Sequence, residues 1–404
     1  MKLIRRDSYM EQLWQVVGTP DIKVITGVRR CGKSKLMEAF IEEIKEKLPD
    51  ANVIHANLSM LENRGLLEYH SLNSFVEYSW AQGRQNFVFI DEVQLCKGFE
   101  WTINSLHASG KYDIYITGSN AFLLNNDLAT LFTGRTFEIE VYPFSFAEYV
   151  KYYGSDIPDK TLDRYIAEGG MAGAYEYPSE AGKIKYMSGV YDTLIVRDVQ
   201  QKYKIRNVPL LEKLSDYLMD NVSNLTSARN IAEYMNGSKE KVNHKTIGTY
   251  MGYLCNAFAF YKIRRYDIRG KRWLVTSDKY YLCDHAFRNA RLGTKNTDRG
   301  RILENIVAIE LLRRGYTLYA GMLYKKEIDF VAMKRDETIY IQVADNLNSE
   351  DTLKRELTPL LQIRDGYPKM IIARTWQPEY MLDGIRIVDA ADWLLNAAGS
   401  KFQQ

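Results

Sequence analysis

A glycine-rich segment near the N-terminus has the residue types and spacing of a phosphate-binding loop. Residues 27–34 follow the pattern G-x-x-x-x-G-K-[ST], between an apolar run at 22–26 and a helical pattern at 35–47. Glycines let backbone N–H groups turn toward phosphate oxygens, and the helix that follows points the positive end of its dipole at the same anion. In this pattern Lys33 reaches the β- and γ-phosphates, and the Ser34 hydroxyl is a ligand of Mg²⁺. The sequence therefore predicts that ATP and Mg²⁺ bind here, with the nucleotide contacted by Gly27, Val28, Arg29, Arg30, Cys31, Gly32, Lys33, Ser34 and Lys35.

Two carboxylates follow a second apolar segment. Residues 87–90 are Phe-Val-Phe-Ile, which is typical of a strand buried on both faces, and Asp91 and Glu92 come directly after it. We expect Asp91 to hold Mg²⁺, directly or through water, and Glu92 to polarise the attacking water as a general base. Taken alone, the pair has an alternative interpretation as acidic turn residues. Together with the phosphate loop upstream, it favours hydrolysis over passive binding.

Three further polar residues lie where a sheet of this type places groups near a phosphate. The segment 114–117 ends in Thr117 and is followed by Ser119, and we expect either side chain to touch the γ-phosphate or the water. Turn chemistry is the alternative for both residues. Arg135 precedes another predicted strand, and an arginine at a subunit edge is expected to contact a neighbour's γ-phosphate. That role implies a homo-oligomer, whereas an ordinary surface arginine implies none.

The elements that must position these residues alternate along the first part of the chain. Strand patterns lie at 23–26, 52–57, 86–90 and 114–117, and helical patterns lie at 9–17, 35–47 and 72–82. Such alternation predicts an α/β fold with a parallel sheet covered by helices, in which ligands sit at the carboxyl ends of the strands. We therefore predict a P-loop NTPase core at 1–142 and a small helical lid at 143–207.

The composition limits the other functions of the chain. Its 404 residues suffice for about two to four domains. The net charge of +3 is small, so nucleic-acid binding would have to come from a local basic patch. The four cysteines form no C-x-x-C pair or zinc spacing, and no apolar run approaches the ~20 residues that span a bilayer. We expect a cytoplasmic protein without membrane partners.

The motifs of the N-terminal part resemble those of certain prokaryotic ATPases of the AAA superclass. The likeness rests on 24–34, 90–94, 117–119, 134–135 and 142–149. Members of that family carry a C-terminal domain of unknown function that resembles restriction-endonuclease-like nucleases. The resemblance implies an AAA-type ATPase core and a nuclease-like fold at the C-terminus, and it extends over nearly the whole chain.

Three helical patterns followed by a basic hairpin predict a winged helix at 208–299. The helical patterns lie at 210–221, 225–235 and 245–256, and the strand patterns at 260–266 and 279–283. A local basic patch attracts phosphate backbones, which makes DNA a candidate partner. The alternative is a winged helix that packs within the molecule and carries a solvated basic turn. The candidate DNA contacts are Lys245, Arg264, Arg265, Arg269, Lys271 and Arg272.

The last part of the chain, 300–404, has the order of a restriction-endonuclease-like α/β domain. Glu304 lies on a predicted helix, Asp329 on a predicted strand, and the next strand should carry a Glu-x-Lys motif. Gln342 and Ala344 stand at those two positions instead. A neutral amide binds Mg²⁺ weakly compared with a carboxylate, and alanine has no ammonium group. The sequence therefore predicts a degenerate nuclease fold whose centre, at Glu304, Asp329 and Gln342, is vestigial.

Three functional hypotheses follow from these motifs. The first is an ATPase whose hydrolysis is coupled to a winged helix and a nuclease-like domain, acting on DNA. The second is a nucleotide-gated switch that binds DNA or protein and hydrolyses ATP slowly. The third, which the substitutions at Gln342 and Ala344 disfavour, is an ATP-driven nuclease.

Overall fold

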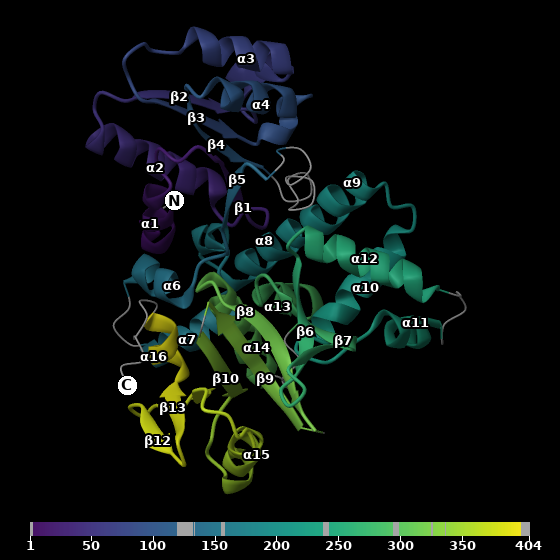
Figure 1. Cartoon of the computed structure of the whole chain (residues 1–404). Helices are drawn as coiled ribbons and strands as arrows, with labels where there is room; N and C mark the ends of the chain where they lie inside the picture. The colour runs from purple at the N-terminus through teal and green to yellow at the C-terminus, as the bar shows by residue number, and fades with distance from the viewer. Residues whose placement is uncertain are drawn as a thin grey trace. The chain divides into compact units, whose positions relative to one another are not determined.

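The N-terminal unit is built on a sheet of five parallel strands. In the computed structural model the chain divides into two units, Lys2–Pro143 and Phe144–Gln404. The structure describes residues 3–118, 132, 134–154, 158–236, 242–293, 299–324, 326–335 and 337–396. The strand order is β2-β3-β4-β1-β5, with neighbouring strands parallel, as the alternating sequence pattern predicts (Figure 1). The strands are β1 (Ile22–Thr26), β2 (Asn52–Asn57), β3 (Asn86–Asp91), β4 (Asp113–Thr117) and β5 (Thr136–Glu140).

Helices cover both faces of this sheet. They are α1 (Asp7–Gln15), α2 (Lys33–Lys47), α3 (Tyr69–Tyr78) and α4 (Phe99–Ser109), with short 3-10 turns η1 (Leu61–Leu66) and η2 (Val93–Leu95). Ile114 and Ile116 of β4 join the core with residues of α3 and α4. Tyr115 between them meets Phe40 of α2, with ring centroids 5.5 Å apart. Successive residues of a strand thus pack on opposite faces of the sheet. Because helices cover both faces, these strands are continuous apolar runs in the sequence.

A buried ion pair lies in this sheet, between β1 and β4. Lys23 is fully buried, and its Nζ donates to Asp113 Oδ1 at 2.6 Å and to the Thr19 carbonyl at 2.6 Å. Asp113 Oδ2 also accepts from the Gly18 N–H at 2.8 Å. The ammonium and the carboxylate therefore both keep hydrogen-bond partners away from water, as buried charges require.

Helices form the first part of the second unit. They are α6 (Phe146–Tyr153), α7 (Pro158–Glu168), η3 (Ala172–Glu176), α8 (Glu180–Asp192), a π-helical stretch η4 (Thr193–Gln200), α9 (Gln201–Tyr203), α10 (Val208–Asp220), α11 (Ala228–Asn236) and α12 (His244–Asn256). Ser145 caps α6 with a reciprocal capping box to Glu148, which satisfies two backbone donors at the start of that helix. The predicted helices of the lid and of the winged helix thus occur near their expected positions.

An eight-stranded mixed sheet forms the rest of this unit. Its order is β12-β13-β11-β10-β9-β8-β6-β7 (Figure 1). The strands are β6 (Phe260–Asp267), β7 (Arg272–Leu282), β8 (Thr317–Leu323), β9 (Lys326–Lys334), β10 (Glu337–Ala344), β11 (Lys369–Ala373), β12 (Tyr380–Leu382) and β13 (Ile385–Asp389). The accompanying helices are α13 (Ala286–Leu292), α14 (Arg299–Arg313), α15 (Glu350–Leu361) and α16 (Ala390–Leu395).

The predicted basic hairpin belongs to this larger sheet. β6 and β7 pair antiparallel, as expected for a wing, but β6 also pairs parallel with β8 from Arg264↔Tyr319 to Asp267↔Met322. The segments 208–299 and 300–404 therefore share one sheet, while the division of the chain falls at residues 143 and 144, next to the predicted boundary at 142. The boundaries at 207 and 299 stay predictions.

None of the helices in the described part of the chain is both long and apolar enough to cross a membrane.

Candidate nucleotide-binding site

The glycine loop joins β1 to α2 with the geometry that its sequence predicts. β1 ends at Thr26, and Gly32 caps the helix that begins at Lys33. Gly27 has φ +133°, and a Cβ built on it would lie 2.1 Å from the Val141 carbonyl oxygen. Only glycine permits this approach of the loop to the segment after β5. The loop is thus packed against its own sheet on one side.

The loop lysine lies inside the loop. Lys33 is buried, and its Nζ donates to the carbonyl oxygens of Gly27 at 2.8 Å and Val28 at 3.2 Å. The ammonium group therefore lies against the backbone that cradles phosphate in loops of this type. Ser34 follows in the first turn of α2 and is half-buried, whereas Lys35 is exposed and forms an ion pair with Glu38.

A buried arginine from the N-terminal segment joins the loop to the segment after β5 through hydrogen bonds. Arg6 donates from Nη1 to the Cys31 carbonyl at 3.2 Å and from Nη2 to the Tyr142 carbonyl at 2.9 Å. Its guanidinium lies 4.5 Å from the centroid of the Tyr9 ring, and the Tyr9 hydroxyl accepts from the Tyr142 N–H at 3.0 Å. Burial raises the pKa of the Cys31 thiol. The Cys31 thiol is thus buried, and the Cys31 backbone carbonyl accepts the hydrogen bond from Arg6.

The predicted catalytic carboxylates lie at the carboxyl end of β3, beside the tips of β2 and β4. Asp91 is buried and accepts from the Thr117 hydroxyl and from Asn57 Nδ2, the latter at 3.0 Å. The strand order brings these three residues to one edge of the sheet, which is also the edge where β1 enters the phosphate loop. The sequence analysis did not identify Asn57. A polar residue at the end of the strand beside β3 is the signal that would have found it.

Glu92 adopts an unusual backbone conformation for its residue type. Its φ is +56°, in the left-handed region that non-glycine residues rarely adopt. The Glu92 N–H donates to Thr117 Oγ1 at 3.1 Å, and one carboxylate oxygen accepts from Gln94 Nε2. Such a conformation costs about 1–3 kcal/mol and persists where surrounding contacts impose it. Thr117 thus connects Asp91 to the backbone of Glu92, and the predicted catalytic residues form one hydrogen-bonded group.

The other predicted nucleotide contacts have different positions. Val28 is buried, Arg29 is half-buried, and Arg30 is exposed with φ +65°. Arg135 is exposed and precedes β5, whose first residue pairs with Ile22 at the amino end of β1. The structure therefore places Arg135 at the edge of the sheet opposite the loop and does not bring it to this chain's own phosphate site. Ser119 lies outside the described residues.

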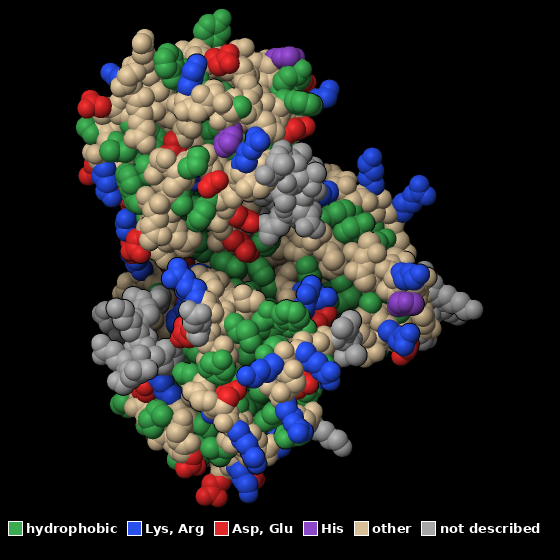
Figure 2. All heavy atoms as spheres, viewed as in Figure 1, with side chains coloured by type: hydrophobic (Ala, Val, Ile, Leu, Met, Phe, Trp, Pro, Cys, Tyr) green, Lys and Arg blue, Asp and Glu red, His purple; other side chains and the backbone are tan. Residues whose placement is uncertain are grey.

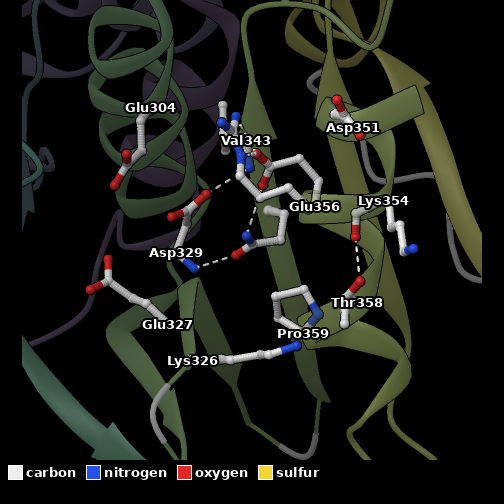
Figure 3. Close-up of a pocket in the computed structure, with 12 residues that line it drawn as sticks. Glu304, Lys326, Glu327, Asp329, Val343, Asp351, Lys354, Glu356, Thr358 and Pro359 are labelled. Carbon is white, nitrogen blue, oxygen red and sulfur yellow. Dashed lines mark hydrogen bonds and ion pairs between the residues drawn. The ribbon is translucent and has the colours of Figure 1, made fainter. Parts of the chain in front are cut away.

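The structure brings the predicted vestigial nuclease residues together in the second unit. Gln342 Oε1 accepts from the Asp329 N–H at 2.7 Å, and Asp329 Oδ2 accepts from the Val343 N–H at 2.8 Å (Figure 3). These residues and Glu304 line a cavity of about 640 Å³. Burial and the nearby Glu304 carboxylate raise the pKa of Asp329 well above its usual range.

Two charged residues that the sequence did not single out contact polar side chains of this cavity. Lys279 of β7 is buried, and its Nζ lies 2.8 Å from Glu304 Oε1, 2.6 Å from Glu327 Oε1 and 3.6 Å from Asp329 Oδ1. Glu356 of α15 accepts from Gln342 Nε2 at 2.9 Å. Although burial works against the charged form, Glu304 and the neighbouring acids hold the pKa of Lys279 well above its usual value. An ammonium group is therefore present, but from a strand that carries no nuclease motif.

The predicted DNA contacts fall on α12 and on the β6–β7 hairpin. Lys245 is exposed near the start of α12. Arg264 and Arg265 lie on β6, exposed and half-buried respectively, and Arg272 opens β7. Arg269 and Lys271 are exposed and lie in the turn between those strands.

Two family models and two relatives match parts of this chain. Residues 19–150 match a family described as "AAA domain", and residues 159–298 match a "Domain of unknown function (DUF8612)". An uncharacterized protein of Haemophilus influenzae is 35% identical over 97% of this chain and 99% of its own length. An uncharacterized protein of Methanocaldococcus jannaschii is 28% identical over 83% of this chain and 77% of its own length.

One of the solved structures that match this chain is that of a Walker-type ATPase of Pyrococcus abyssi. It is 15% identical, with a TM-score of 0.49, and the match covers 71% of this chain and 95% of that one.

Proposed function

Because the chain belongs to the same family as the Haemophilus influenzae protein, with an AAA-type P-loop domain at residues 19–150, we propose that it binds and hydrolyses ATP. The observation that carries the proposal is the meeting of the phosphate loop with Asp91, Glu92 and Thr117 at one edge of the five-stranded sheet. The AAA domain by itself supports nucleotide binding, and the roles of single residues are part of the proposal.

Each residue has a role that follows from its position. Backbone N–H groups of the loop and the Lys33 ammonium bind the phosphate oxygens and stabilise the charge that develops on them. Glu92 takes a proton from the attacking water, and Thr117 holds Glu92 and Asp91 in fixed relation. Ser34 and Asp91 would hold Mg²⁺, which supplies further charge neutralisation when bound. Oxygen donors of this kind fit that ion.

The proposal is tested by Mg²⁺-dependent phosphate release. In Glu92→Gln we expect kcat to fall roughly 100-fold or more while a fluorescent ATP analogue still binds, because only proton transfer is lost. In Lys33→Ala we expect nucleotide binding to fall as well. Glu100→Gln, on α4, is the matched control for a lost carboxylate. Equal rates for Glu92→Gln and the wild-type protein would contradict the assignment.

A second candidate function is a nucleotide-gated DNA-binding switch. It is supported by the exposed basic residues on the hairpin β6–β7, which follows α10, α11 and α12 as a wing would. In this proposal residues 208–299 act as a winged helix, 143–207 act as a lid, and ATP occupancy changes DNA affinity. Equal DNA affinity with ATP, with ADP and without nucleotide would contradict the switch. Strong stimulation of a slow ATPase by DNA would support it.

We further propose that the C-terminal cavity, in a restriction-endonuclease-like domain at 300–404, does not cleave DNA. Lys279 engages Glu304, Glu327 and Asp329, the carboxylates that a metal ion would need. Among the residues that the structure describes, no three His, Cys, Asp or Glu side chains are grouped to hold a metal ion. Incubation of plasmid with Mg²⁺ or Mn²⁺ should leave it intact. Nicking that is lost in Asp329→Ala would contradict this proposal.

Assembly into a homo-oligomer is proposed from Arg135 alone. Since it lies away from its own loop, Arg135 would reach a γ-phosphate only in a neighbouring copy. Mass in solution with and without ATP tests this. A monomer that hydrolyses ATP at the same rate with Arg135→Ala would contradict it. The predicted cytoplasmic location stays a prediction.

A further inference from the structure

Two turns lie next to each other at one end of the eight-stranded sheet. β6 and β8 are parallel neighbours, and Asp267, the last residue of β6, pairs with Met322 near the end of β8. The Ile268 N–H continues this pairing to the Met322 carbonyl at 3.0 Å. The β6–β7 turn and the β8–β9 turn therefore leave the sheet side by side (Figure 1).

A large aromatic side chain is exposed next to the first turn and in the second: Trp273 is the second residue of β7, and Tyr324 follows β8. Trp273 is 64% exposed and Tyr324 is 66% exposed. The Arg269 guanidinium lies 5.3 Å from the centroid of the Tyr324 ring, which directly connects the two turns. Exposed Trp and Tyr rings beside an arginine offer flat surfaces on which unpaired bases stack.

Cations lie on the same segments. Arg269 and Lys271 lie on the first turn, Arg272 opens β7, and Lys326 opens β9. Figure 2 shows lysine and arginine side chains gathered over the lower part of the eight-stranded sheet, near the ends of β8 and β9. The two nearby acids already have partners: Asp267 lies 3.6 Å from Arg272, and Glu327 lies 2.6 Å from Lys279. The surface therefore has an excess of positive charge.

The first turn is held in a fixed shape. Asp267 Oδ1 accepts from the Arg269 N–H at 3.2 Å, and a Cβ on Gly270 would lie 2.5 Å from Asp267 Oδ2. Because glycine has no side chain, the Asp267 carboxylate can pack directly against the backbone of the turn at Gly270. The arginine and lysine side chains thus extend from a preorganised backbone.

This surface continues into the C-terminal cavity. Lys326 lines the cavity, and Glu327 and Asp329 follow it along β9 (Figure 3). At about 3.3 Å per strand residue, Asp329 lies about 10 Å along β9 from Lys326. That is the length of about three nucleotides of a stacked strand, at 3.4 Å per phosphate.

We propose that the tip surface, formed by Arg269, Lys271, Arg272, Trp273, Tyr324 and Lys326, binds single-stranded DNA. Bases stack on Trp273 and Tyr324, the cations bind the phosphates, and the strand leads toward the cavity. The proposal rests on the proposed DNA-binding role and deepens it by naming the form of DNA. Single strands are favoured over duplex because a duplex keeps its base faces covered and uses only the cations.

Binding is measured by fluorescence anisotropy on the full-length protein without nucleotide, with labelled oligo(dT) and with a duplex of equal length. We expect tighter binding of the single strand. Trp273→Ala and Tyr324→Ala should each weaken it roughly 5- to 100-fold, which is the range for one lost stack. Lys271→Gln with Arg272→Gln should reduce the salt slope by about 1.4, the value for two phosphate contacts.

Trp101→Ala and Tyr78→Ala are matched controls, because these rings are 68% and 91% exposed in the N-terminal unit. They should leave oligo(dT) affinity unchanged. The proposal is overturned if duplex binds as tightly as oligo(dT), if the two aromatic variants bind like the wild-type protein, or if anionic phosphatidylglycerol vesicles compete equally. Phosphate release is measured on the same preparations. Oligo(dT) binding without any phosphate release would contradict the proposed ATPase and leave this inference intact.

Discussion

At the residue scale, the orientation of Asp91 depends on a side chain from the neighbouring strand. Asn57 donates to one Asp91 oxygen at 3.0 Å, and the Thr117 hydroxyl donates to the other. A metal-binding carboxylate held from both sides keeps the geometry that the ion requires. In the proposed site Asn57 is therefore a positioning residue, which would act through Asp91 rather than on ATP.

Substitution of Asn57 by Ala should weaken the response to Mg²⁺ more than the binding of nucleotide. We expect the Mg²⁺ concentration for half-maximal phosphate release to rise about 10- to 100-fold, the usual cost of losing a group that orients a metal ligand. The control is Asn52→Ala, at the amino end of the same strand, where the side chain bonds to Asn86 and the Ser79 carbonyl. An unchanged Mg²⁺ titration for Asn57→Ala would exclude the positioning role.

The site residues that sequence could predict are those whose signal is local. Lys33, Asp91 and Glu92 lie inside short motifs that carry their own strand and helix context. Arg6 and Asn57 reach the site from 25 and 34 residues away in the sequence, so their roles depend on the order of the strands. Lys279 is a similar case, because β7 reaches the cavity only through the pairing of β6 with β8.

At the element scale, the phosphate loop depends on the absence of a side chain at Gly27. A Cβ there would lie 2.1 Å from the Val141 carbonyl oxygen, at a backbone φ of +133° that other residues rarely adopt. The loop would have to move away from the segment after β5, and the carbonyls that now accept from Lys33 would move with it.

Gly27→Ala should therefore abolish detectable binding of a fluorescent ATP analogue. Overpacking of this kind should also lower the free energy of unfolding by about 1–3 kcal/mol. Gly18→Ala is the matched control, since Gly18 also has positive φ, +74°, but has no atom within 4 Å of an added Cβ. Normal analogue affinity in Gly27→Ala would show that the loop tolerates the displacement.

A second element-scale feature is the buried contact between α7 and the segment after β7. The His285 ring packs against Tyr165, with its Nε2 at 2.9 Å from the Tyr165 carbonyl. Burial lowers the pKa of His285 below its usual 6.5, against the opposing effect of Asp284. The unfolded chain therefore binds a proton more readily at this residue than the folded protein does.

The sign of the pH dependence follows from that difference. The contribution of His285 to stability is complete above pH 6.5 and is lost as the pH falls from 6.5 toward the lowered pKa. Burial raises the pKa of Asp284, which acts in the opposite direction above its unfolded value of 3.8. In urea titrations the free energy of unfolding should fall less between pH 7.5 and 5.5 in His285→Gln than in the wild-type protein, by up to about 1.4 kcal/mol per unit of pKa depression. The exposed His244→Gln should keep the wild-type slope, and equal slopes for all three proteins would refute the assignment.

At the scale of the whole molecule, periodicity predicts the elements but not how they share a sheet. The helices and strands of 208–299 and 300–404 lie near the positions that the sequence indicates, because each is set by a local pattern. The parallel pairing of β6 with β8 joins residues about 55 apart and leaves no local signal. The predicted boundary at 299 therefore falls between strands of one continuous sheet, which the local patterns do not indicate.

That continuity makes a prediction about truncation. A chain ending at Gly293 keeps α10–α13 and the hairpin but loses β8, α14 and β9. β6 would lose its parallel partner, Lys279 would lose all three carboxylates, and the Leu282 backbone would lose both hydrogen bonds to Asn305. An unpaired buried ammonium costs several kcal/mol. Each unsatisfied buried backbone group costs about 1–3 kcal/mol. Limited trypsin digestion of residues 1–293 should therefore degrade the segment 208–293 while leaving a resistant fragment near 3–143, whose own sheet is complete. In the full chain both segments should resist. A protected 208–293 segment in the truncated chain would instead show that it folds independently, as a free-standing winged helix does.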